Sequence, residues 1–132
     1  MKKIDWTDKL DTGITVIDRQ HRRIVDYINR LYEAHAQGST RAETGHIIDE
    51  LVDYTQTHFA FEETMLEDVD YDLLARHKED HRQFIAQVDD LRQRFRQHEE
   101  TAVDLNHLMV GWLLNHILNE DSRYAPVVMQ EH

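Results

Sequence analysis

Cysteine is absent from the 132-residue sequence, and proline and glycine are scarce, with one and four copies. Without cysteine the chain can form no disulfide, thiolate cluster or thiol-linked haem, so any metal site must use histidine and carboxylates. Long apolar runs are also absent: the start, MKKIDWTDKLD, has no apolar stretch after its lysines, and nowhere do about 18 apolar residues follow one another. We therefore expect a soluble cytoplasmic protein with no export signal and no membrane insertion.

Basic residues are few relative to acidic ones. Lys and Arg number 15 against 26 Asp and Glu, which gives a formal net charge of -11. A nucleic acid or an acidic membrane surface would be repelled, so we expect neither as a partner. The length corresponds to one domain, which we place at residues 1–132. Ten histidines in such a chain are unusual and need an explanation.

Apolar residues recur at intervals of three and four, which predicts helices rather than strands. After an irregular N-terminal arm, Asp18 is expected to cap the first helix and Gly38 to end it. Ser39 or Thr40 is expected to start the second helix, which runs to about Asp68.

Two further helices follow the acidic turn DVDYD. We expect Asp72 to cap the third helix, which closes at QHEET, and the fourth helix to finish before Pro126. Because the connections are short, the predicted fold is all-α, an up-down-up-down four-helix bundle preceded by the irregular arm.

Seven polar residues interrupt the apolar faces of these helices at matching depth. Neighbouring helices in such a bundle are antiparallel, so all seven fall at one end of it. Each would cost about 1–3 kcal/mol if it were buried without a partner. A shared metal removes this cost, and we predict a metal site formed by His21, His58, Glu62, His77, His81, His116 and Asp121.

The individual spacings are weak evidence. His58 and Glu62 are four residues apart, but so are His46 and Glu50, which are turned about 120° away and are expected to form a solvated pair. The pattern HKEDH is also more often a surface pattern than a metal site. The remaining histidines are assigned to no site: His35, His98 and His107, toward the opposite end, and His132 at the terminus.

The spacing of His116 and Asp121 does not fit a regular helix. Five residues correspond to about 500°, which turns Asp121 about 140° away from the direction of His116. The segment NEDSRYAP contains residues that loosen a helix, and its proline prevents regular continuation. We therefore expect the final turn of the fourth helix to loosen.

Four segments resemble the hemerythrin family, in particular its stand-alone bacterial members: VIDRQH, HFAFEETM, HKEDH and WLLNHILNEDSRY. The likeness covers nearly the whole chain, and the order of the spaced ligands is far more specific than any single pair. The resemblance implies a non-haem di-iron centre with an oxide or hydroxide bridge. It assigns one iron to His77, His81 and His116, the other to His21 and His58, and makes Glu62 and Asp121 bridges between them.

The resemblance also implies an oxygen pocket. Several apolar neighbours of the ligands are expected to wall it, although all of them would serve equally well as core packing. These neighbours are Ile24, Phe59, Trp112, Leu113 and Ile117.

The implied ligand set leaves one coordination position open. Five imidazoles, two bridging carboxylates and a bridging hydroxide fill eleven of the twelve positions of two octahedral ions. The open position belongs to the iron with two histidines, where a small ligand can bind. Ferritin-like di-iron proteins use more carboxylates, and the smaller anionic share here should disfavour highly oxidised iron.

These features predict reversible dioxygen binding, for storage or for delivery to an oxygen-consuming partner, by a protein that is not an enzyme. Two other classes stay open. A di-iron oxidoreductase that handles peroxide or nitric oxide, or an oxygen or iron sensor, could use the same ligands. A helical interaction module would bind metal only incidentally. The donors also suit zinc or manganese, so the choice of iron depends on the resemblance.

Overall fold

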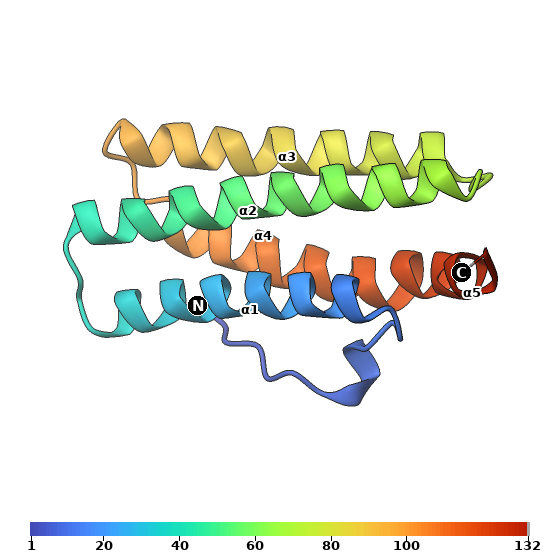
Figure 1. Ribbon diagram of the computed structural model, residues 1–132. Coiled ribbons are helices and arrows are strands. Elements are labelled where there is room, and N and C mark those ends of the chain that lie inside the picture. Colours follow the sequence, from blue (N-terminus) through green and yellow to red (C-terminus); the bar gives the residue numbers. More distant parts are fainter. Residues whose placement is uncertain (132) are drawn as a thin grey trace.

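The computed structural model describes residues 1–131 and forms an all-α, up-down-up-down four-helix bundle, as predicted (Figure 1). The last three helical elements of the chain are consecutive, and together they form the fourth arm of the bundle. The terminal His132 lies outside the described residues. The elements are the 3-10 helix η1 (Asp8–Leu10), α1 (Thr15–Ala36), α2 (Arg41–Asp68), α3 (Leu74–Arg96), α4 (Ala102–Asn115), the π-helix η2 (His116–Asp121) and α5 (Ser122–Glu131).

The junction between α1 and α2 follows the predicted local chemistry. Gly38 adopts a φ of 66°, the left-handed region in which glycine carries no steric penalty. The Gly38 amide donates to His35 and the Ser39 amide donates to Ala34, a Schellman arrangement that satisfies the last carbonyls of α1. Thr40 then caps α2, and Glu43 completes a capping box.

Two predicted caps are wrong. Asp18 lies inside the first turn of α1, where its carboxylate accepts hydrogen bonds from the backbone amides of Thr12 at 2.7 Å and Gly13 at 3.1 Å. A carboxylate is favourable throughout the first turn of a helix, so Asp18 can tie down the preceding arm without being the cap. Before α3 the cap position is Leu73 rather than Asp72, and it makes no side-chain cap bond.

The prediction that the fourth helix stops before Pro126 is also wrong. Pro126 lies inside α5. A proline removes one backbone hydrogen bond and bends a helix, but it does not have to end it. Tyr124 and Val128 of α5 are buried against Leu66 of α2 in a second apolar cluster. Burial of these side chains offsets the lost hydrogen bond.

The N-terminal arm is fastened to the bundle by two asparagines. Asn29 of α1 exchanges two hydrogen bonds with the backbone of Ile4, both at 2.9 Å. Asn106 of α4 binds the backbone of Lys2 in the same way, at 2.7 and 2.9 Å. Farther along the arm, Leu10 of η1 is buried in the main core. The arm therefore follows a fixed path although most of it is irregular.

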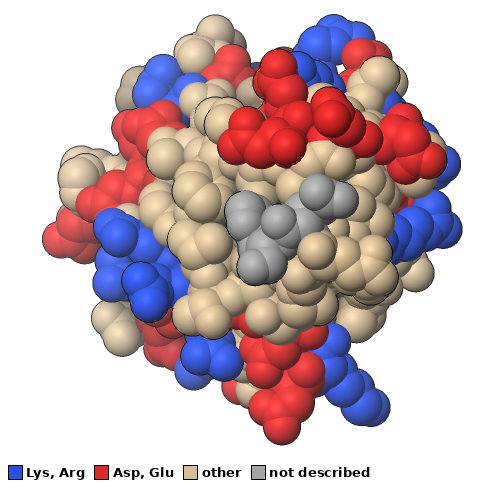
Figure 2. Space-filling model, turned by 45° about the vertical axis from the view of Figure 1, so that its right-hand side comes forward, with Lys and Arg blue, Asp and Glu red and all other residues tan. Residues whose placement is uncertain are grey.

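The main core fills the middle of the bundle and draws on all four long helices. Its most deeply buried members include Ile28 of α1, Leu51 of α2, Val88 of α3 and Met109 of α4, each fully inaccessible to solvent. Within residues 1–131 no helix is both long and apolar enough to cross a membrane. Figure 2 shows many uncharged side chains on one face, with Asp and Glu gathered above and below them and Lys and Arg at the sides. Over the whole sequence acidic residues outnumber basic ones, 26 to 15, which is unfavourable for binding a polyanion.

Candidate metal centre

All seven predicted ligands meet inside one end of the bundle. They come from α1, α2, α3 and η2, and each is between 0% and 3% exposed. All five imidazoles direct the Nε2 atom toward the interior of the cluster, where it contacts a carboxylate oxygen. Regular helical spacing places six of these residues on inward faces, and Asp121 joins them through a different local structure.

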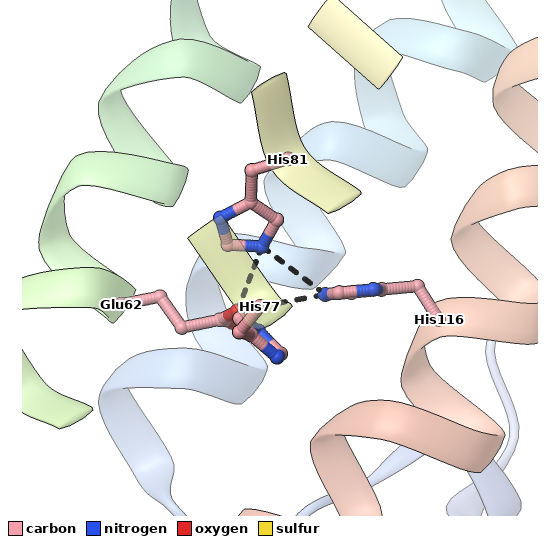
Figure 3. A group of neighbouring side chains, drawn as sticks. All are labelled: Glu62, His77, His81 and His116. Atoms are coloured by element: carbon pink, nitrogen blue, oxygen red, sulfur yellow. Dashed lines mark hydrogen bonds and ion pairs between the residues drawn. The ribbon is translucent and has the colours of Figure 1, made fainter. Parts of the chain in front are cut away.

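His77, His81 and His116 form a three-histidine group around Glu62 (Figure 3). Glu62 Oε1 lies 3.1 Å from His81 Nε2 and 3.5 Å from His116 Nε2, and it is also paired with His77 Nε2. Figure 3 shows these side chains converging from α2, α3 and the fourth arm. The donor set corresponds to three nitrogen ligands and one oxygen ligand of a metal ion.

His21 and His58 form a two-histidine group next to it, with their Nε2 atoms 3.1 Å apart. The second oxygen of Glu62, Oε2, lies 3.3 Å from His58 Nε2. Glu62 therefore presents one oxygen to each histidine group.

Asp121 repeats this arrangement. Its Oδ1 lies 2.9 Å from His116 Nε2, in the three-histidine group, and its Oδ2 lies 3.0 Å from His21 Nε2, in the two-histidine group. Neither oxygen has hydrogen-bond geometry, so both are buried without a hydrogen-bond partner among the described residues. Oxygens that approach nitrogens closely without bonding to them are what a common cation between them would explain.

The π-helix η2 is what brings Asp121 into the site. His116 is the first residue of η2 and Asp121 is the last. A π-helix makes i→i+5 hydrogen bonds, so a residue five positions later returns to nearly the same face. In a regular α-helix Asp121 would be turned about 140° away. The predicted loosening of this turn is confirmed, and it takes the form of a π-helix.

The electrostatics of the cluster also fit a bound cation. Burial acts to raise the pKa of Glu62, but hydrogen bonds with the surrounding imidazoles, His116 first, hold it well below its usual value. Burial acts to lower the pKa of His116, yet the charge of Asp121 raises it to about 10. Two buried carboxylates thus stay ionised only if positive charge is present among them. Divalent ions would supply this charge and leave the imidazoles neutral, the form that binds metals.

Three residues that the sequence reasoning missed hold these side chains in place. His58 Nδ1 donates to Gln20 Oε1 at 2.6 Å, and His81 Nδ1 donates to a carboxylate oxygen of Glu63 at 3.0 Å. The Tyr124 hydroxyl donates to Glu62 Oε2 at 2.9 Å. Tyr124 is three residues beyond Asp121, and this helical spacing could have identified it as a neighbour of the site. Gln20 and Glu63 have no such spacing signal: each is next to a ligand in the sequence, a position that a regular helix turns about 100° away from that ligand.

The five apolar residues predicted to wall an oxygen pocket occupy two environments. Phe59 stacks on the ring of His81 at 3.7 Å between centroids, and Trp112 stacks on His116 at 4.3 Å. Both therefore pack against the three-histidine group. The others are buried in the main core without exposure above 2%: Ile24, Leu113 and Ile117.

The histidines assigned to no site are placed as predicted where the structure describes them. His46 is exposed and pairs with Glu50 at 2.6 Å on the surface of α2. The other three described ones are also exposed: His35, His98 and His107.

Comparison with known proteins agrees with this geometry. The family model of the hemerythrin HHE cation binding domain matches residues 12–128, and the chain belongs to the hemerythrin family. The resemblance found in the sequence is thereby confirmed. The chain thus combines a family known for oxygen binding with a buried histidine and glutamate cluster that can hold metal.

Individual relatives cover nearly all of the chain. A bacteriohemerythrin of Pseudomonas aeruginosa is 47% identical over 128 residues, which cover 97% of this chain and 83% of that protein. A bacteriohemerythrin of Methylococcus capsulatus is 34% identical, with 96% and 97% covered. A crystal structure of wild-type hemerythrin matches with a TM-score of 0.89 at 33% identity, covering 95% of this chain and 97% of the other.

Proposed function

We propose that this protein binds dioxygen reversibly at a non-haem di-iron centre, for storage or for delivery to an oxygen-consuming partner. The observation that carries the proposal is the position of Glu62 and Asp121. Each carboxylate has one oxygen near the three-histidine group and the other near the two-histidine group. Two carboxylates that both face two separate sets of nitrogen donors favour a pair of ions over a single one.

The donors divide unequally between the two ions. The three-histidine group would hold one iron and the two-histidine group the other, with Glu62 and Asp121 shared. Two ferrous ions, when bound, would supply the open coordination position and the two electrons that reversible dioxygen binding requires. The ion with two histidines has fewer protein ligands, so its position is the one available to a small molecule.

The chain itself contributes orientation and exclusion of water. Tyr124 donates a hydrogen bond to Glu62 Oε2 at 2.9 Å and fixes the direction of that carboxylate. Ile24, Leu113 and Ile117, which precede or follow ligands closely in the sequence, are buried apolar side chains with 0% to 2% exposure. A dry site slows the loss of a reactive bound ligand to water and protons, which a reversible carrier needs.

The donor set also favours binding over substrate oxidation. Five imidazoles and two carboxylates carry less negative charge than the carboxylate-rich sites of ferritin-like di-iron proteins. Highly oxidised iron is therefore less stabilised here. A di-iron oxidoreductase acting on peroxide or nitric oxide, or an oxygen or iron sensor, would share the same ligands, so turnover must be measured directly.

Metal analysis combined with optical spectra tests the proposal. We expect iron in the purified protein, a spectrum that changes when air is added to the anaerobic ferrous form, and return to the starting spectrum when oxygen is removed. Steady consumption of peroxide or nitric oxide with a reductant would instead support the oxidoreductase. A protein without stoichiometric metal and without a colour change would be a helical interaction module.

A further inference from the structure

The two histidine groups differ in the charge of the residues that support them from outside. In the three-histidine group, His81 Nδ1 donates to the carboxylate of Glu63 at 3.0 Å. In the two-histidine group, His58 Nδ1 donates to the neutral side-chain amide of Gln20 at 2.6 Å. Both bonds place the proton on Nδ1 and leave Nε2 free to bind a metal, but only one of the two acceptors carries a charge.

The charge of a residue that accepts a hydrogen bond from a ligand imidazole changes how strongly that imidazole binds the metal. A carboxylate that accepts from the far nitrogen of an imidazole strengthens the near nitrogen as a donor, and a neutral amide does so less. Glu63 is only 26% exposed at its side chain, so solvent screens its effect incompletely. His81 should therefore be a stronger ligand than His58.

The packing adds to this difference. Phe59 lies parallel to the ring of His81, at an interplanar angle of 2°, and Trp112 lies nearly parallel to His116, at 16°. In the two-histidine group the rings of His21 and His58 meet edge to face, at an interplanar angle of 74°, and no aromatic ring stacks on either of them among the described residues. The rings of the three-histidine group are thus better held in their binding geometry before any ion arrives.

We propose that Glu63 and Gln20 are positioning residues that make the two metal sites unequal, so that the three-histidine site fills first and the two-histidine site fills second and releases its ion first. This inference rests on the proposed di-iron centre and adds the order of filling and its cause. It concerns metal affinity, which can be measured without oxygen binding.

Titration of the metal-free protein with cobalt(II), followed by calorimetry and visible absorption, tests the proposal. Cobalt(II) accepts the same nitrogen and oxygen donors as ferrous iron. We expect two ions to bind in two steps. Glu63→Gln keeps a hydrogen-bond acceptor but removes the charge, and it should weaken the first step about 10- to 100-fold while leaving the second in place. Gln20→Glu should strengthen the second step by about tenfold or more.

Matched controls make the same changes at exposed positions away from the ligand histidines. These are Glu67→Gln, one turn after Glu63 on α2, and Gln93→Glu near the end of α3. Both should leave the two steps unchanged. Histidine ¹⁵N shifts of the zinc-loaded protein provide a second measurement, because the proton should be found on Nδ1 of both His58 and His81.

The outcomes separate the inference from the function on which it rests. Binding of fewer than two ions would overturn the dinuclear centre and this proposal with it. Two ions that bind in one step, or a Glu63→Gln variant that weakens both steps equally, would leave the dinuclear centre intact and overturn only the order of filling. A proton on Nε2 of metal-loaded His81 would also overturn the proposal.

Discussion

Tyr124 donates its hydroxyl hydrogen to Glu62 Oε2 at 2.9 Å, and both side chains are fully buried. The contact links α5 to α2 at the carboxylate that faces both histidine groups. The packing of α5 in the second apolar cluster therefore also fixes the orientation of Glu62, a candidate bridging ligand.

Tyr124→Phe removes this hydrogen bond while keeping the ring. We expect the metal-free protein to lose about 1–3 kcal/mol of unfolding free energy, because a buried carboxylate oxygen loses a donor. Chemical denaturation measures the change. Tyr32→Phe is the control and should have little effect. Tyr32 is half-buried near the C-terminal end of α1, whereas the ligand His21 is near the N-terminal end of that helix. Equal losses in the two variants would show that the contact with Glu62 is unimportant.

Removal of the metal should lower the melting temperature. The purified protein should carry about two irons per chain, and the metal-free core must hold five imidazoles and two carboxylates without their common partner. Calorimetry before and after treatment with a chelator measures the difference. Identical melting of the two forms would contradict a shared buried site.

His58→Ala should abolish stable oxygen binding. It takes one of two imidazoles from the two-histidine group, so water should fill the gap and the iron there is expected to be lost more readily. His46→Ala is the matched control, because His46 is exposed on the same helix and pairs only with Glu50 at the surface. Iron content and the spectrum in air measure both effects. If the two variants behave alike, the assignment of His58 to the site is wrong.

Ile117→Asn should shorten the lifetime of the spectrum formed in air. The substitution keeps similar bulk, but it brings an amide donor and water beside the centre, where Ile117 is 2% exposed. Iron content should stay near normal. Leu118→Asn makes the same change at the exposed neighbouring position and should leave the decay rate unaltered. An unchanged decay rate in Ile117→Asn, together with a lower melting temperature, would make Ile117 a packing residue only.

The fold could be predicted because helices obey short-range rules. The three-and-four spacing of apolar residues, the start of α2 at Ser39 or Thr40 and the glycine at position 38 are local features, and each is confirmed. Prediction was wrong where tertiary contacts decide the outcome. Asp18 binds the backbone of the arm instead of capping α1, and α5 continues past Pro126 because its apolar side is buried.

The site was predictable to the same extent. Six residues on inward helix faces could be found from spacing, Asp121 required a loosened turn as well, and the structure brings all seven together. The supporting residues Gln20 and Glu63 could not be found in this way. Their bonds to His58 and His81 cross between helices and depend on the rotation of each helix and on the side-chain conformations, which no local pattern specifies.

Titration of the anaerobic ferrous protein with dioxygen tests the central claim most directly. One open position per pair of ions predicts uptake of about one dioxygen per chain. The account further predicts full return of the anaerobic spectrum when oxygen is removed under argon, through repeated cycles. Continued uptake beyond one dioxygen per iron pair, or an absorbance change that persists after oxygen is removed, would contradict reversible binding at this centre.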